Sequence, residues 1–218
     1  MESRGLRRQR RLRRRRMSET RYPESIMANT NGCLRSVGVY CGSSEDNDPA
    51  FRADAQALGE AVAAAGLTLV YGGASRGLMG VVADAALSKG GNVIGVLPEA
   101  LRGREIAHHG ITSLEMVGTM HERKARINEL SDALVALPGG HGTLDELMEA
   151  VTWAQIGIHA KPCILVNTAG YWDGLLRFLD SAVTAGFVRA NDRALLRVAA
   201  NADEALAMAA SVCGEARG

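Results

Sequence analysis

The sequence has few lysines, few aromatic residues and no long apolar run. Only three lysines occur among its 218 residues, Lys89, Lys124 and Lys161. A pyridoxal phosphate enzyme needs a Schiff-base lysine and a partner for the pyridine nitrogen, and none of the three lies in such a setting. A membrane-spanning helix needs roughly 18 or more apolar residues in a row, and no run approaches that length. We therefore expect neither this cofactor nor a membrane span.

The chain also lacks paired cysteines and the histidine spacing of a zinc site. Its four cysteines, at positions 33, 41, 163 and 213, form no Cys-x-x-Cys pair, and Cys41 and Cys163 lie in apolar runs. This is typical of reduced, buried thiols in a cytoplasmic protein. The five histidines, at 108, 109, 121, 141 and 159, do not follow a zinc-binding pattern. We predict no metal site and no cofactor.

Charge is divided unevenly along the chain. Residues 1–21 hold ten arginines and two acidic residues, which leaves 15 of the 25 basic and 22 of the 24 acidic residues to the rest. We expect a disordered, arginine-rich tail over 1–33 and one folded domain over 34–218. The tail could bind nucleic acid or anionic lipid. We favour the simpler interpretation that translation starts at Met17 or Met27, so nucleic acid is not expected as a partner.

Short β-rich runs alternate with helical patterns over the rest of the chain. The runs are almost continuously apolar, which is typical of parallel strands covered on both faces. The expected strands are 37–41, 67–71, 92–97, 133–137 and 163–167, and the expected helices are 49–65, 78–89, 119–131, 143–156, 172–185 and 202–212. The alternation predicts an α/β fold, a doubly wound Rossmann-like parallel sheet with helices on both faces. Such sheets bind ligands at the carboxyl ends of their strands.

The most informative segment is PGGHGTLDE at 138–146, which joins an expected strand to a helix through a glycine turn. The glycines let a ligand approach the main chain. Free amides and the positive end of the helix dipole then favour a phosphate. Glu146 lies one turn past Thr143 on the same helix face. Because a carboxylate repels a bare anion, we expect Glu146 to serve another part of the ligand, such as a sugar diol.

A plainer interpretation of Thr143 and Glu146 is a capping box, Ser/Thr-x-x-Glu, at the start of the helix. Thr119 and Glu122 have the same spacing and make a second candidate box. The glycine turn itself is neither a Walker A loop, which needs Gly-Lys-Ser/Thr, nor G-x-G-x-x-G. Nucleoside triphosphates and NAD are therefore disfavoured as ligands.

Arg123 is the second chemical clue. It shares a helix face with the apolar residues Met120, Ile127 and Leu130, so the pattern places it against the core. A buried arginine without a partner is costly, and this one should face a carboxylate or a phosphate. A purely structural ion pair is the alternative, since such pairs also bury charge.

Several blocks in a fixed order make the chain similar to a known family. They are VYCGSS at 39–44, VYGGASRGLMG at 70–80, MHERKA at 120–125, PGGHGTLDE at 138–146, TWAQ at 152–155, GIH at 157–159 and KP at 161–162. Together they resemble the LOG ("lonely guy") family, cytokinin riboside 5'-monophosphate phosphoribohydrolases, often mislabelled as lysine decarboxylases. The resemblance runs from about Ser36 to the last helix. Ala74, where the family usually has a third glycine, and His141, often a tyrosine, depart from the pattern without touching the presumed chemistry.

The resemblance implies hydrolysis of the N-glycosidic bond of (N6-modified) adenosine 5'-monophosphates, which releases the free base, a cytokinin, and ribose 5-phosphate. It implies Arg123 and Glu146 as the catalytic pair. It implies nucleotide contacts from Glu105, Lys124, Gly140, His141, Gly142, Thr143, Leu144, Asp145 and Thr152. It also implies a homodimer with active sites near the shared interface. By itself, Glu105 reads equally well as a solvated loop acid.

This chemistry passes through an oxocarbenium-like ribose, which a carboxylate stabilises before water attacks C1'. Glu146 fits either a ribose-diol anchor or the water-activating base. Arg123 could neutralise the phosphate, position Glu146 or favour the departing adenine. Two alternative functions stay open: a general purine 5'-monophosphate nucleosidase acting chiefly on AMP, and a non-catalytic nucleotide-binding sensor or carrier. Phosphate binding alone does not require the carboxylate, which speaks against the carrier.

Overall fold

The computed structural model describes residues 34–101 and 107–215. The expected tail, 1–33, and Glu105 lie outside these residues. The described chain forms a seven-stranded sheet in the order β4-β3-β2-β1-β5-β6-β7, and every neighbouring pair is parallel. The strands are β1 (Ser36–Tyr40), β2 (Thr68–Tyr71), β3 (Asn92–Pro98), β4 (Ser113–Val117), β5 (Ala133–Ala136), β6 (Cys163–Val166) and β7 (Leu196–Ala199). The predicted doubly wound sheet is confirmed.

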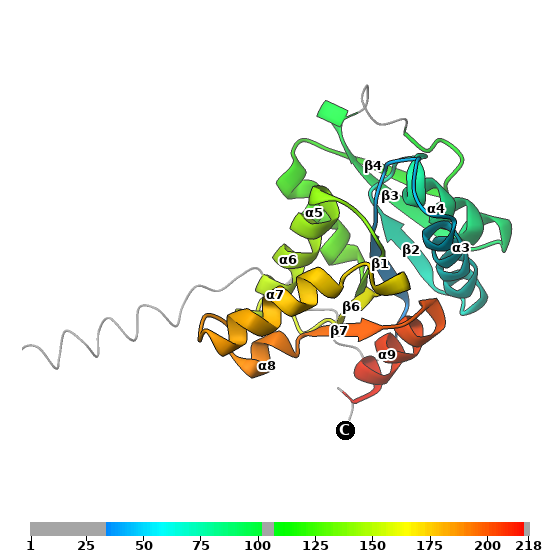
Figure 1. The fold of residues 1–218 in the computed structure, drawn as a ribbon. Coiled ribbons are helices and arrows are strands. Elements are labelled where there is room, and N and C mark those ends of the chain that lie inside the picture. Colours follow the sequence, from blue (N-terminus) through cyan, green and yellow to red (C-terminus); the bar gives the residue numbers. More distant parts are fainter. Residues whose placement is uncertain (1–33, 102–106, 216–218) are drawn as a thin grey trace, which may run out of the picture.

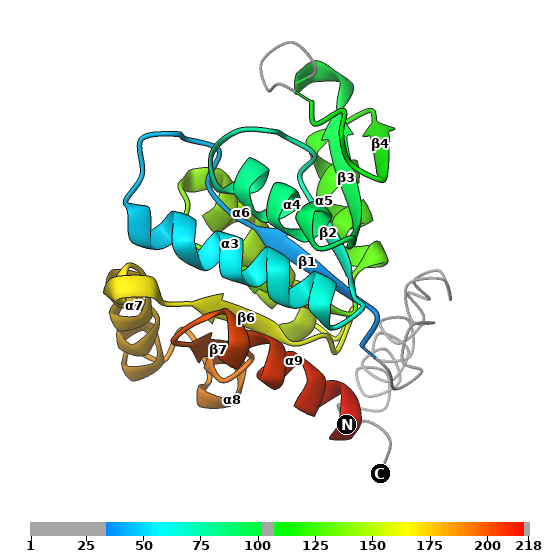
Figure 2. The same ribbon diagram turned by 90° about the vertical axis from the view of Figure 1, so that its right-hand side faces the viewer.

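Helices cover both faces of this sheet (Figure 1). The larger ones are α3 (Pro49–Ala64), α4 (Gly77–Ser88), α5 (Met120–Leu130), α6 (His141–Gln155), α7 (Asp173–Thr184) and α9 (Ala202–Glu215), with the short α8 (Ala190–Arg193), η1 (Glu99–Leu101) and η2 (Thr168–Gly170) between them. Figure 2 shows α3, α4 and α9 in front of the strands, with α5 and α6 behind them. No helix of the described residues is both long and apolar enough to cross a membrane.

Two buried clusters correspond to the two faces. One joins strand residues such as Val37 and Leu69 to Leu58 of α3 and Val82 of α4. The other joins Leu134 and further strand residues to α5, α6 and α7, with Ile127, Leu147 and Leu179 as examples. Because both faces are covered, the central strands β1 and β5 are buried along their whole length. The near-continuous apolar runs of the sequence reflect this double burial.

The two edge strands, β4 and β7, were not predicted from the sequence. In β4 no residue is fully buried, and β7 alternates buried Leu196 with exposed Arg197. Edge strands are covered less completely, so they lack the apolar run by which the central strands were identified. The start of α6 is a second correction, because this helix begins at His141, two residues before the expected start.

Candidate active site

Three glycine turns meet at the carboxyl ends of the strands, after β1, β2 and β5. Because β1 lies between β2 and β5, the strand order reverses beside it, and doubly wound sheets bind ligands at this place. The Gly42 amide donates to the Pro138 carbonyl at 3.1 Å, and the Leu78 amide donates to the Gly42 carbonyl at 2.9 Å. These bonds tie the three turns into one structure.

The turn after β5 presents free main-chain amides. Gly140 is the N-cap of α6, and no side chain caps the helix. The first backbone bond at this end runs from the Leu144 amide to the Gly140 carbonyl, at 3.0 Å. The amides of residues 140–143 therefore have no carbonyl partner within the helix. Together with the helix dipole they form a site suited to an anion.

The glycines of this turn divide into two kinds. A Cβ at Gly139 would lie 2.1 Å from Oγ1 of Thr143, whereas a Cβ at Gly140 or Gly142 would meet nothing within 4 Å. Gly139 is therefore required by packing inside the protein. Gly140 and Gly142 instead leave space beside the free amides, where a ligand can approach.

The capping-box interpretation of Thr143 and Glu146 is wrong. Since Gly140 is the N-cap, Thr143 is already the third helical residue and Glu146 the sixth. Both side chains are buried, at 3% and 5% exposure. At the start of α5, by contrast, the Glu122 amide donates to Oγ1 of Thr119 at 3.1 Å, so Thr119 caps this helix. The Glu122 carboxylate accepts from the Gly118 amide at 2.8 Å, and not from the Thr119 amide as a full capping box requires.

Arg123 and Glu146 are brought together under this turn. Nη1 of Arg123 lies 3.7 Å from Oε1 of Glu146, an ion pair between two side chains that are 4% and 5% exposed. The same guanidinium donates from Nε to the Val96 carbonyl at 3.2 Å and from Nη2 to the Gly72 carbonyl at 3.1 Å. The main-chain carbonyls of Gly72, just after β2, and of Val96, within β3, thus hold Arg123, and its remaining nitrogen faces the carboxylate. Arg123 has the carboxylate partner that its predicted burial required.

Gly72 makes this arrangement possible. A Cβ at Gly72 would lie 1.9 Å from Nη2 of Arg123. Any larger residue would displace the guanidinium from its carbonyl partners. In the sequence, Gly72 appeared only within the block at 70–80, because its contact with Arg123 joins residues 51 positions apart.

Two buried residues at the end of β1 lie near the Arg123–Glu146 pair. Tyr40 and Cys41, at the end of β1, are 3% and 1% exposed. Burial raises the pKa of the Tyr40 phenol well above its usual value, and the negative charge of Glu146 raises it further. The same two causes raise the pKa of the Cys41 thiol. Both groups are neutral, so Arg123 and Glu146 are the charges that define this part of the site.

Lys124, the other predicted cation, faces α6. Its Nζ lies 3.0 Å from Oδ2 of Asp145 and 3.2 Å from Oε1 of Glu149. Burial lowers the pKa of this amine, but the hydrogen bonds to both carboxylates outweigh it, so the pKa lies above its usual value. Lys124 is therefore a charged side chain beside the first turns of α6.

The other predicted residues are spread along α6. His141, Gly142 and Asp145 are exposed at its start, and Leu144 is partly buried. Thr152 lies eleven residues past His141, about 16 Å along the helix axis at about 1.5 Å per residue. Its hydroxyl donates back to the Met148 carbonyl at 2.7 Å. Within one chain, Thr152 is thus far from the amides of the glycine turn.

Tyr171, which the sequence analysis did not consider, also contacts the turn. Its hydroxyl donates to the Gly139 carbonyl at 2.7 Å. Tyr171 follows β6, and 32 residues separate it from Gly139, so no local pattern in the sequence marks the contact.

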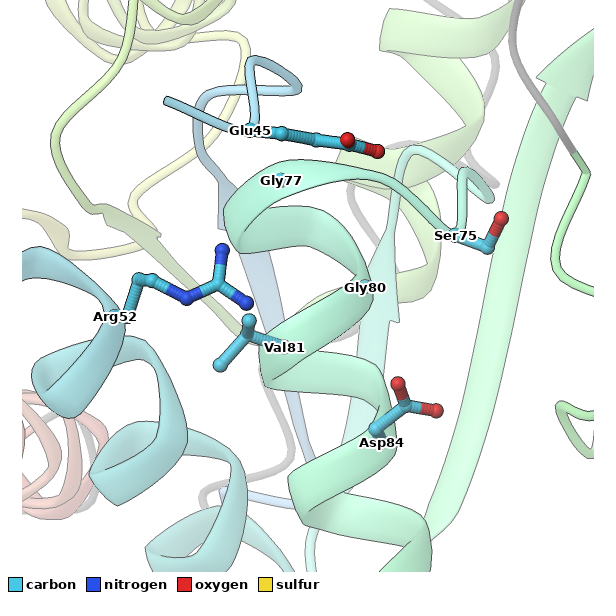
Figure 3. Close-up of a pocket in the computed structure, with 7 residues that line it drawn as sticks. All are labelled: Glu45, Arg52, Ser75, Gly77, Gly80, Val81 and Asp84. Atoms are coloured by element: carbon cyan, nitrogen blue, oxygen red, sulfur yellow. The ribbon is translucent and has the colours of Figure 1, made fainter. Parts of the chain in front are cut away.

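A hollow of about 210 Å³ lies elsewhere, between α3 and the start of α4 (Figure 3). Arg52 comes from α3 and Asp84 from α4, with Glu45 on the loop above them. Neither Arg123 nor Glu146 lines it. With two carboxylates for one guanidinium, it does not favour an anionic ligand.

Comparison with known proteins identifies the family. Residues 79–209 match the family model described as "Possible lysine decarboxylase". The "Probable cytokinin riboside 5'-monophosphate phosphoribohydrolase LOGL9" of Oryza sativa subsp. japonica is 50% identical over 162 residues, which are 74% of this chain and 71% of that protein. The "Cytokinin riboside 5'-monophosphate phosphoribohydrolase" of Rhodococcoides fascians is 42% identical over 184 residues, 84% of this chain and 93% of that protein.

A similar solved structure is that of the molybdenum cofactor carrier protein from Chlamydomonas reinhardtii. It is 25% identical with a TM-score of 0.62, and the match covers 82% of this chain and 98% of that one. Sequence identity to the curated relatives is much higher, over most of both proteins. The chain belongs to the LOG family of cytokinin riboside 5'-monophosphate phosphoribohydrolases.

Proposed function

We propose that this protein hydrolyses the N-glycosidic bond of N6-modified adenosine 5'-monophosphates, releasing the free base and ribose 5-phosphate. The observation that carries the proposal is the buried Arg123–Glu146 pair beside an open amide turn. Curated relatives at 50% and 42% identity are named for this activity. The amides of 140–143 would bind the 5'-phosphate, and the carboxylate would lie under the ribose.

In this proposal Arg123 positions Glu146 and keeps it charged. Nε and Nη2 of Arg123 already donate to main-chain carbonyls, so the guanidinium is poorly placed to wrap a phosphate. Its Nη1 instead faces the carboxylate across 3.7 Å. In a buried site, a fixed positive charge favours the ionised carboxylate. We therefore propose that the amides of α6, rather than Arg123, bind the phosphate.

Glu146 would then act on the sugar. As the bond to the base breaks, positive charge develops on the ribose, and a preorganised, buried carboxylate stabilises it. The same carboxylate can bind the ribose hydroxyls and receive a proton from the water that attacks C1'. The departing base takes the electron pair of the broken bond and one proton from solvent, so one water is consumed overall. Binding energy from the 5'-phosphate holds the ribose in the reactive position.

Lysine decarboxylation, which the family model's description suggests, does not fit the three lysines. Lys124 is paired with Asp145 and Glu149, and Lys89 lies 3.4 Å from Glu60. Lys161 donates to the carbonyl and side-chain oxygens of Asn128. Each amine thus serves as a structural partner, and none is placed to form a Schiff base.

The proposal is tested by supplying an N6-prenylated AMP, AMP and the two matching nucleosides, and measuring free base and ribose 5-phosphate. Loss of two charge-assisted hydrogen bonds, each worth roughly 1.5 to 3 kcal/mol, should lower kcat/KM for the nucleosides on the order of a hundredfold or more. Comparable values with and without the phosphate would contradict the proposal. A clear preference for AMP would favour the general nucleosidase, and tight binding without release of base would favour the carrier.

We also propose a homodimer in which Thr152 serves the site of the partner chain. Large apolar side chains in or near α6 and α7 support a protein interface here, because Ile156, Phe178 and Phe187 are 60%, 65% and 88% exposed. Light scattering should give twice the chain mass. Mixing inactive Glu146→Gln with impaired Thr152→Val chains should restore activity, since mixed dimers contain one intact site. Failure to restore it in proven mixed dimers would contradict the sharing.

We propose a cytoplasmic location, which the buried free thiols of Cys41 and Cys163 support. Cell fractionation tests this, and activity confined to a secreted fraction would contradict it.

A further inference from the structure

The turn that carries Tyr171 is held in a strained conformation. Ala169 has φ +51°, and it is the one residue other than glycine with positive φ among residues 34–101 and 107–215. An alanine in the left-handed region is disfavoured, because its Cβ comes too close to the following carbonyl oxygen. Such conformations persist only where the surroundings determine them, and they concentrate at functional sites.

Side-chain hydrogen bonds on both sides of Ala169 hold this turn. The Asn167 side chain accepts from the Trp172 amide at 2.8 Å and donates to Asp173 at 2.8 Å. The Thr168 hydroxyl donates to Asp54 on α3. The turn is therefore tied to itself and to a neighbouring helix, and its geometry is defined up to Tyr171.

The ring of Tyr171 is fixed as well. It makes edge-to-face contacts with Phe51, at 5.3 Å between ring centroids, and with Trp172, at 4.8 Å. Such pairs add packing energy and a preferred orientation. The hydroxyl thus approaches Gly139 from a constrained ring, although Tyr171 is 44% exposed. A side chain that served only to pack against Phe51 and Trp172 would not need this hydroxyl.

The hydrogen bond from Tyr171 acts on the peptide unit that begins the amide site. The Gly139 carbonyl and the Gly140 amide belong to one peptide plane, and in a trans peptide they point in opposite directions. No described peptide bond is cis. A donor that holds the carbonyl on one side therefore aims the amide N–H toward the other. The preceding carbonyl, of Pro138, is held in the same way by the Gly42 amide at 3.1 Å.

We propose that Tyr171 is a positioning residue, which fixes the Gly139–Gly140 peptide and aims the Gly140 amide at the 5'-phosphate. The inference rests on the proposed function. Glycine at 139 and 140 makes this peptide unusually free to rotate, so an external clamp has a large effect on it. Tyr171 does not touch the substrate, and its contribution appears only for ligands that carry the phosphate.

The test is Tyr171→Phe, which removes one oxygen and keeps the aromatic contacts. Loss of one positioning hydrogen bond should raise KM for the 5'-monophosphate and lower its kcat/KM roughly three- to tenfold. The kcat/KM for the matching nucleoside should stay unchanged. The ratio of the two values from one preparation does not depend on the folded fraction, so a less stable variant still tests the proposal. Thr184→Val is the matched control, because its hydroxyl donates to Asp180 within α7, and its ratio should equal the wild-type ratio.

Binding of ribose 5-phosphate by calorimetry separates this inference from the proposed function. Tyr171→Phe should weaken that binding roughly three- to tenfold, even if the wild-type protein proved to be a carrier without turnover. Failure of the wild-type protein to release base would overturn the function and leave the binding test intact. An unchanged dissociation constant, or an equal loss for nucleoside and monophosphate, would overturn the role of Tyr171.

Discussion

Two glycine turns at the carboxyl ends of the strands, before α4 and before α6, have similar sequences but differ in how closely the rest of the protein packs against them. A Cβ at Gly77, which begins α4 with φ +56°, would lie 2.5 Å from main-chain atoms of Ser43 and Ser44. A Cβ at Gly142, in the first turn of α6, would meet nothing within 4 Å. The loop after β1 covers the start of α4, while the start of α6 is open.

The difference shows that a strand–glycine–helix pattern has two physical uses. Before α4, glycine allows two main-chain segments to pack closely, and the Leu78 amide is already bonded to Gly42. Before α6, glycine serves no contact within the protein at 140 and 142, and a buried ion pair lies beneath the free amides. Open space and a buried ion pair, rather than the glycines themselves, distinguish the proposed ligand site.

The largest predicted effect comes from removing the buried carboxylate beside the α6 turn. Glu146→Gln keeps the shape of the side chain, and we expect kcat to fall at least a hundredfold, a loss of about 2.7 kcal/mol or more in transition-state stabilisation. Arg123→Lys should be nearly as damaging, because an ammonium cannot reach both carbonyls and the carboxylate at once. Steady-state kinetics on an N6-prenylated AMP measure both effects.

Glu60→Gln is the matched control, since it removes a partly exposed carboxylate of α3 that pairs with Lys89 far from the α6 turn. Its kcat should equal that of the wild type. Turnover by Glu146→Gln near the wild-type rate would mean that the buried pair is structural.

How far the sequence predicts this site depends on the range of the contacts. The turn at 138–146 and the placement of Arg123 against the core follow from local patterns, because strand and helix periodicities span only a few residues. The N-cap at Gly140 was missed because Thr143 and Glu146 have the spacing of a capping box. In the fold, Thr143 is instead buried inside the helix. Gly72 and Tyr171 could not be found, since their contacts join segments brought together only by the strand order.

Exchanging alanine for glycine in the two turns should give opposite results. Gly77→Ala places a side chain against main chain at positive φ, so we expect a loss of more than about 2 kcal/mol in the free energy of unfolding. Gly142→Ala removes a poor helix former from α6 and should stabilise the protein by up to about 1 kcal/mol. Its methyl group would occupy ligand space, however, and kcat/KM for the 5'-monophosphate should fall about tenfold or more.

Thermal melts measure the predicted changes in stability of the two variants, and steady-state kinetics measure the predicted changes in kcat/KM. Gly77→Ala should keep its kcat per folded molecule. A stable, fully active Gly142→Ala protein would show that the space beside the α6 amides is not used by the substrate.

The smallest predicted effect concerns the amino ends of the strands, where His159 precedes β6. Burial, and then the charge of Lys161, lower the pKa of His159 to about 4, while the unfolded chain has a value of about 6.5. Between these values the unfolded state binds a proton that the folded state does not, so stability falls as pH falls from about 6.5 to about 4. Because the ring is only partly buried, we expect about 1 kcal/mol of this loss between pH 7.5 and pH 5.

His159→Asn keeps an acceptor for the Lys161 amide, which donates to Nδ1 at 3.2 Å, and it cannot titrate in this range. Urea unfolding at both pH values should therefore show a smaller acid loss in His159→Asn than in the wild type. An identical loss in the two proteins would place the acid sensitivity elsewhere, and the glycine-turn edge with its buried ion pair would be the first region to examine.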